Sequence, residues 1–161
     1  LLLWIAPAII VVDQLTKNWI VAHFELHESR PVIPGFFNLT YIHNLGAAFG
    51  IMNDSSANWR IPFFRIVPVL ALGFVAQVFR TLPAAEKWMS VALALIVGGA
   101  IGNFIDRVRY GWVVDFLDFH WQGQVHFWVF NVADSAITVG VVLILIDSLI
   151  RKKKRGVLGV S

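Results

Sequence analysis

Four long apolar segments constrain the fold of this 161-residue chain more than any other feature of its sequence. An α-helix needs about 20 mostly apolar residues to cross the hydrocarbon core of a bilayer. The four segments of this kind cover residues 2–22, 61–79, 88–105 and 130–150. Only 14% of the residues are charged, whereas soluble domains carry roughly 25%. The sequence therefore predicts a mainly α-helical membrane protein, with four transmembrane helices in a single domain over 1–161.

The basic residues predict how these helices are oriented in the membrane. Segments rich in Lys and Arg stay on the cytoplasmic side, and RKKKR at residues 151–155 follows the last apolar segment. With four spans, both termini and the tail 151–161 are then cytoplasmic, and residues 23–60 and 106–130 face outward. No basic region or small-residue cleavage site marks the first apolar segment as a signal peptide, so we expect a retained helix.

The two outward segments have different patterns. In residues 31–50, a Pro-Gly turn signal is followed by alternating apolar and polar residues, which predicts a hairpin or small extracytoplasmic β-sheet. Residues 112–128 contain six aromatic side chains. Because aromatic rings favour the headgroup level of a bilayer, we expect this second segment to form a surface-lying loop or short helix.

Carboxylates gather where the second outward segment meets the last apolar segment. Asp134 begins that segment, and Asp115 lies in the loop before it, so the loop can fold back and bring the two together. Two adjacent carboxylates do not ionise together easily, and such a pair can act as base and acid. Asp134 can equally cap a helix. These physical arguments leave both roles of Asp134 open, and they do not choose between Asp115 and Asp118.

Other polar residues occur in pairs at helical spacing. Asp13 and Lys17 share one helix face, and we favour a structural ion pair for them, although charges inside a membrane are also functional candidates. Asn103 and Arg107 have the same spacing near the outer boundary. This second pair can support a polar site, or Arg107 can simply contact lipid phosphate.

The remaining candidates concern peptide and metal binding. Asn44 precedes a run of small residues that begins at Gly46; such a run lets an extended peptide approach the backbone, or it forms an ordinary turn. His23 and His27 have the spacing of a helical metal pair, but no third ligand stands out. The chain has no cysteine, which excludes disulfides and thiolate sites. We expect no metal, no cofactor and no nucleic-acid partner.

Five blocks of sequence, taken in order, resemble those of a known family. They are D-Q-x-x-K at 13–17, N-x-G-A-A-F at 44–49, G-G-x-x-G-N-x-x-D-R at 98–107, V-V-D-F at 113–116 and F-N-x-A-D-S at 130–135. In a four-span chain, this series resembles bacterial lipoprotein signal peptidase, also called signal peptidase II. The resemblance covers nearly the whole chain.

The resemblance implies an aspartic endopeptidase of the bacterial inner membrane with its active site at the periplasmic face. Such an enzyme cuts a prolipoprotein before a cysteine that already carries diacylglycerol, and globomycin-like inhibitors occupy the same groove. By motif, Asp115 and Asp134 form the catalytic dyad. The residues that match lining or supporting positions are Asn44, Gly46, Asn103, Arg107 and Asn131. The implied partners are this substrate and membrane lipids, and we expect the enzyme to work as a monomer.

Two other classes of function compete with this interpretation. A transporter would use the charged residues as a proton or ion relay, yet most of them gather at one interface instead of crossing the bundle. A scaffold protein would leave the carboxylate pair, Asn103 and Arg107 unexplained. The sequence therefore favours the peptidase, with the transporter as the alternative.

Overall fold

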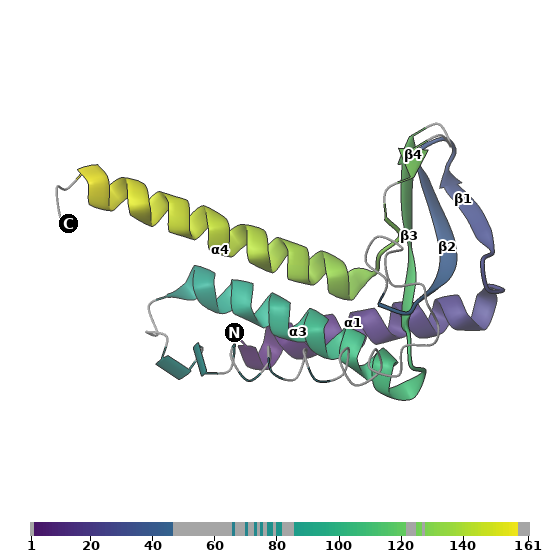
Figure 1. The fold of residues 1–161 in the computed structure, drawn as a ribbon, viewed down its shortest axis with the longest axis horizontal. Coiled ribbons are helices and arrows are strands. Elements are labelled where there is room, and N and C mark those ends of the chain that lie inside the picture. The colour runs from purple at the N-terminus through teal and green to yellow at the C-terminus, as the bar shows by residue number, and fades with distance from the viewer. Residues whose placement is uncertain are drawn as a thin grey trace.

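In the residues that it describes, the computed structural model of this protein contains three long helices and a small β-sheet (Figure 1). It describes residues 2–46, 86–121, 125–126 and 128–157, with scattered positions between 66 and 81. The helices and strands, in chain order, are α1 (Leu2–His23), β1 (Ser29–Ile33), β2 (Phe37–Asn44), α3 (Lys87–Arg109), β3 (Val113–Trp121), β4 (Val125–His126) and α4 (Val132–Val157). The sheet stands at one end of the helices, while α1 begins and α4 ends on the side away from it.

Each of the three helices is long and apolar enough to cross a membrane. The qualifying stretches are Trp4–His23, Lys87–Arg109 and Val132–Arg151. They correspond to three of the four apolar segments in the sequence. The segment expected at 61–79 lies for the most part outside the described residues, although the described positions within it are helical. A total of four transmembrane helices therefore stays a prediction.

Glycines on α3 allow the other two helices to approach its backbone closely. A Cβ atom added at Gly98 would lie 3.1 Å from the Cα of Ala6 on α1, and one at Gly99 would lie 2.3 Å from the carbonyl oxygen of Ala133 on α4. The Gly99 contact is too short for a real side chain, and a Cβ at Gly98 would in addition lie 2.9 Å from the Cβ of Ile9. Small residues at helix contacts of this kind are typical of membrane proteins, and here they place α3 between α1 and α4.

The same contacts define the directions of the helices. Gly98 lies beside Ala6 and Gly102 beside Asp13, so α1 and α3 run in the same direction. Gly140 of α4 lies against Ala92, near the start of α3. Because α4 begins beside the middle of α3 and continues toward the start of α3, the two helices run in opposite directions.

The sheet confirms the predicted hairpin in the first outward segment. Its strand order is β1-β2-β3-β4, with all neighbouring strands antiparallel. Along the β2–β3 pair, Leu39 lies opposite Leu117 and Ile42 opposite Asp115, with a register shift between these two pairs. A bulge of this kind bends a strand and is common beside functional sites.

The prediction for the second outward segment was wrong. Residues 113–121 form strand β3 rather than a surface-lying loop or short helix. Most side chains of β3 are buried on both faces of the strand, so the alternation of apolar and polar residues that marks a half-exposed strand is absent. Phe116, for example, packs with Ile20 and Phe24 at the end of α1. Among the residues of this segment that the structure describes, Trp121 and Trp128 have exposed aromatic rings.

Candidate active site

Asp115 lies in the middle of the buried strand β3, with 2% of its surface exposed. Its two carboxylate oxygens accept hydrogen bonds from two asparagines: Oδ1 from Asn131 Nδ2 at 2.6 Å and Oδ2 from Asn44 Nδ2 at 2.8 Å. The Oδ1 atom of Asn44 accepts the backbone N–H of Gly46 at 2.8 Å. Gly46 has φ of 89°, a value that glycine adopts without strain. The turn after β2 therefore orients Asn44 toward Asp115.

Asp134 lies in the first turn of α4, where it and Asn131 form a reciprocal helix cap. The backbone N–H of Asp134 donates to Asn131 Oδ1 at 2.9 Å, and the backbone N–H of Asn131 donates to Asp134 Oδ2 at 3.3 Å. This is the geometry of a capping box. The other carboxylate oxygen, Oδ1, accepts Asn103 Nδ2 at 2.7 Å. Capping and a place in the polar site, which the sequence presented as alternatives, are combined in one residue.

Asn131 joins the two carboxylates. Because its Oδ1 atom faces the backbone of α4, its Nδ2 atom points to β3 and reaches Asp115. The same Nδ2 atom lies 3.2 Å from the carbonyl oxygen of Val114 and 3.1 Å from Asn103 Oδ1. With 0% of its surface exposed, Asn131 fixes the start of α4 against β3.

The environment of Asp115 favours its protonated form. Burial, and then the negative charge of Asp134, raise the pKa of Asp115 to about 7 from its usual 3.8. The hydrogen bonds from Asn44 and Asn131, and the charge of Lys17, act in the opposite direction without cancelling the effect. Near neutral pH this site therefore contains a carboxylic acid that can donate a proton, beside a second carboxylate.

Arg107 places a positive charge near the C-terminal end of α3, one turn after Asn103. Its Nη1 atom donates to the backbone carbonyl of Asn103 at 3.3 Å, and its charge interacts most strongly with Asp134 and then with Asp115. Because it lies one helical turn beyond Asn103, it lies on the same face of α3 as Asn103. A half-buried guanidinium here can bind a carbonyl or an anionic group.

Behind the carboxylates lies a buried polar network centred on Lys17. Lys17 Nζ is 2.9 Å from Asp13 Oδ2 and 3.0 Å from Asp106 Oδ2, and it donates to Asn103 Oδ1 at 2.9 Å. The ion pair expected from the spacing of Asp13 and Lys17 is thus part of a larger network. Asp106 was not predicted as part of the site from the sequence. It lies three residues after Asn103 on the same helix face, and this spacing could have indicated that it joins the same polar site.

The carboxylates of this network also bind backbone N–H groups of two further elements, α4 and β3. Asp13 Oδ1 accepts the N–H of Ala133 in the first turn of α4 at 2.9 Å. Asp106 Oδ2 accepts the N–H of Val114 in β3 at 3.0 Å. Because carboxylates from α1 and α3 hold the starts of β3 and α4, the positions of Asp115 and Asp134 depend on this network.

Asp118 and the two histidines lie apart from this arrangement. Asp118 accepts Thr40 Oγ1 at 2.8 Å, and it is three residues from Asp115, on the opposite face of the strand. The helix α1 ends at His23, so His27 does not share its helical spacing. His23 Nδ1 instead bonds the carbonyl of Trp19. The described residues contain no cluster of three or more side chains suited to a metal ion.

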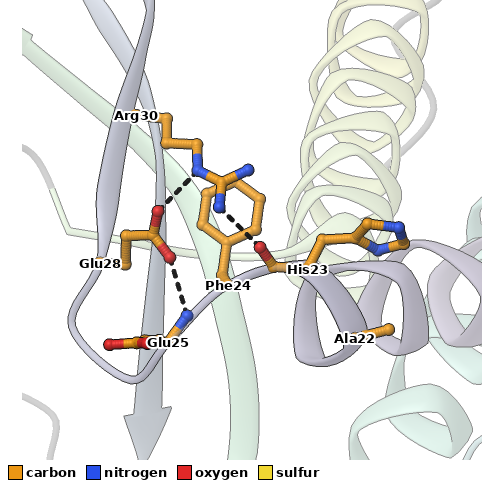
Figure 2. Close-up of a pocket in the computed structure, with 6 residues that line it drawn as sticks. All are labelled: Ala22, His23, Phe24, Glu25, Glu28 and Arg30. Carbon is orange, nitrogen blue, oxygen red and sulfur yellow. Dashed lines mark hydrogen bonds and ion pairs between the residues drawn. The ribbon is translucent and has the colours of Figure 1, made fainter.

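A separate cavity of about 560 Å³ lies at the C-terminal end of α1 (Figure 2) and is lined by Ala22, His23, Phe24, Glu25, Glu28 and Arg30. Arg30 donates to Glu28 Oε1 at 2.6 Å and to the carbonyl of His23 at 2.7 Å. Its guanidinium also lies 4.1 Å from the centre of the Phe24 ring. Because the last carbonyls of a helix lack intrahelical partners, we assign Arg30 a structural role in capping α1.

Comparison with known proteins identifies the family to which this site belongs. Residues 5–150 match the sequence model of a family described as signal peptidase (SPase) II. The chain belongs to the signal peptidase II family. Lipoprotein signal peptidase of Syntrophotalea carbinolica is 51% identical over 91% of this chain and 89% of its own length. That of Geobacter sulfurreducens is 50% identical over the same shares of the two chains.

Solved structures agree with the assignment to the signal peptidase II family. One, described as a bacterial membrane enzyme, has a TM-score of 0.85 and 38% identity over 96% of this chain and 90% of its own. A second with the same description has a TM-score of 0.80 and 38% identity over 92% of both chains. The family resemblance is confirmed, and the chain is a membrane peptidase. The transporter alternative finds no support.

Proposed function

We propose that this signal peptidase II is an aspartic endopeptidase that removes the signal peptide from prolipoproteins, cutting before a cysteine that carries diacylglycerol. The observation that carries the proposal is the pair of carboxylates, Asp115 and Asp134, joined through the Asn131 side chain and Asn103. Relatives named lipoprotein signal peptidase support the substrate class. Water supplies the nucleophile, and in this proposal the two carboxylates activate it by acid–base catalysis without a metal or other cofactor.

The two carboxylates take complementary roles in this mechanism. Asp134, held by Asn103, is the ionised base that removes a proton from water, while protonated Asp115 donates its proton to the carbonyl oxygen of the scissile bond. The hydroxide adds to the carbonyl carbon and gives a tetrahedral intermediate. Asp134 then passes its proton to the departing amine of the cysteine, and Asp115 recovers a proton from the intermediate's hydroxyl group. Each carboxylate ends as it began.

Substrate binding uses the outer end of the bundle. A diacylglycerol group anchored in the outer leaflet would hold the scissile bond at a constant depth, which is catalysis by positioning. Gly46 leaves room beside Asn44 for an extended peptide, and the guanidinium of Arg107 is placed to bind peptide carbonyl groups. Globomycin-like inhibitors would bind in the same place as the substrate peptide, and membrane lipids would border it.

The helix directions support a four-span arrangement in the bacterial inner membrane. Because α1 and α3 run in the same direction, the chain between them must return across the thickness of the bundle, which fits a span at 61–79. Both termini are then cytoplasmic, and the sheet and the carboxylates face the periplasm. We expect the enzyme to work as a monomer.

Replacing each dyad carboxylate by its amide tests the mechanism. Asp115→Asn and Asp134→Asn keep the size of the side chain but remove its proton transfer, so we expect losses of about 10²- to 10⁴-fold in kcat. The assay is cleavage of a diacylglyceryl-modified precursor by the purified enzyme in detergent. Asp118→Asn is the matched control, because Asp118 lies on the other face of β3, and it should retain activity. Full activity of either dyad variant would contradict the mechanism.

A further inference from the structure

The carboxamide of Asn103 is held in one orientation by its neighbours on α1 and α4. Its oxygen accepts Lys17 Nζ at 2.9 Å and Asn131 Nδ2 at 3.1 Å, and its Nδ2 donates to Asp134 Oδ1 at 2.7 Å. An ammonium group has only donors, so the amide oxygen must face Lys17. The amide N–H₂ group then necessarily points away from Lys17, toward Asp134.

Lys17 has more contacts than a structural ion pair requires. Its ammonium has three N–H donors, and these meet Asp13, Asp106 and the oxygen of Asn103. Either carboxylate alone would neutralise the charge of Lys17. The third contact is to a neutral amide, and the other end of that amide is bonded to a carboxylate of the dyad.

We propose that Lys17 is a positioning residue for peptide cleavage, which orients the Asn103 carboxamide so that its N–H₂ group donates to Asp134. The proposal rests on the role of Asp134 as the base. Lys17 touches neither substrate nor dyad in this scheme and acts only through Asn103. The buried charge on α1 therefore serves the reaction as well as the packing of the helices.

Loss of Lys17 has a consequence that loss of packing alone does not have. Without the ammonium, the Asn103 oxygen keeps only the hydrogen bond from Asn131 Nδ2 at 3.1 Å. The carboxamide is then held less firmly, and its hydrogen bond to Asp134 weakens. Because this contact serves the chemical step rather than substrate binding, kcat falls while KM changes little. The charged groups that act on Asp134 in the intact site are Arg107 on α3 and Asp115 on β3.

The experiment is a double-mutant cycle on the purified full-length enzyme. Its variants are Lys17→Met, Asn103→Ala and the two combined, assayed by cleavage of a diacylglyceryl-modified precursor across a range of pH. We expect Lys17→Met to lower kcat about 10- to 100-fold, as is typical when a group that orients a reactive side chain is lost. KM should change little. The combined variant should be no slower than Asn103→Ala alone.

A second variant guards against misfolding, because Lys17→Met leaves two buried carboxylates without their cation. Lys17→Met combined with Asp106→Asn restores the charge balance and should show the same loss of kcat with a thermal unfolding temperature near that of the parent. Leu15→Ala, on the exposed side of α1, is the control and should retain activity.

Three results would overturn the proposal. They are an unchanged kcat in a folded Lys17 variant, fully additive losses in the cycle, or failure of even the charge-balanced variant to fold, which would make the role of Lys17 purely structural. Each of these is compatible with an inactive Asp134→Asn variant. Failure of this inference is therefore distinguishable from failure of the aspartic mechanism, which an active Asp134→Asn enzyme would reveal.

Discussion

At the scale of single residues, the site depends on asparagines that use both ends of their side chains. Asn131 caps α4 with its oxygen and bonds Asp115 with its nitrogen. Asn44 accepts the N–H of Gly46 and donates to the other oxygen of Asp115. An asparagine whose oxygen is bound to a backbone N–H can offer only its N–H₂ group to a carboxylate. The local backbone thus determines the orientation of each donor.

The raised pKa of Asp115 predicts how activity depends on pH. In the proposed mechanism Asp115 donates a proton, and burial together with the charge of Asp134 raises the pKa of Asp115 to about 7 from its usual 3.8. We therefore expect kcat/KM to fall as pH rises above about 7, approaching tenfold per pH unit. The two groups titrate as a pair, so the profile reports the upper pKa of the dyad. The measurement is the pH profile of precursor cleavage.

The Asn44→Ala variant tests whether Asp115 is the acid that sets the descending limb. The hydrogen bond from Asn44 stabilises ionised Asp115 and lowers its pKa, so its removal should move the descending limb to higher pH. A descending limb that stays in place in this variant, or a wild-type profile that remains flat into the alkaline range, would count against Asp115 as the acid.

At the scale of the elements, α3 organises the site because it contacts α1, α4 and β3. Its glycine-bearing stretch allows backbone contact with α1 and α4, while Asn103 and Asp106, farther along the helix, supply the polar contacts to Asp134, Lys17 and β3. The residues that pack the helices closely and the residues that form the polar network thus occupy consecutive parts of α3. A shift of α3 against α4 would move Asn103 relative to Asp134.

Two glycine substitutions with opposite expected results test this packing. Gly99→Ala places a methyl group 2.3 Å from the Ala133 carbonyl oxygen, so α4 must move, at a cost of about 1–3 kcal/mol for an overpacked contact. We expect a lower unfolding temperature in detergent and reduced activity. Gly73→Ala is the matched control, because nothing lies within 4 Å of its added Cβ. Equal stability of the two variants would contradict the role of Gly99.

At the scale of the whole molecule, residues from distant parts of the chain meet at the sheet end of the bundle. Lys17 comes from α1, Asn103 from α3, Asp115 from β3 and Asp134 from α4. With the even number of spans proposed above and a basic tail at residues 151–155, we expect that end in the periplasm and both termini in the cytoplasm. The reactive groups are then on the side where the lipid-modified cysteine of a substrate would be anchored.

Single introduced cysteines test this topology, because the chain has none of its own. A membrane-impermeant maleimide should label Val32→Cys, at an exposed position of β1, in intact spheroplasts. It should label Ser161→Cys, in the basic tail, only after the membrane is permeabilised. The cysteine-free parent chain is the control. Labelling of Ser161→Cys without permeabilisation would mean that the predicted orientation is wrong.

The sequence by itself determined the membrane class, three of the helices, the hairpin and the family. These depend on hydrophobicity, short-range alternation and contiguous motifs, all of which are local in the chain. It did not reveal β3 as a strand, because both faces of β3 are buried and its pattern does not alternate.

The tertiary structure alone decided how the charged residues are connected. It placed Asp115 rather than Asp118 beside Asn131, added Asp106 to the pair of Asp13 and Lys17, and directed Asn103 toward Asp134. Each of these contacts joins residues from different elements, and its geometry depends on how α1, α3 and α4 pack. Residue types and spacing along the chain do not contain that information.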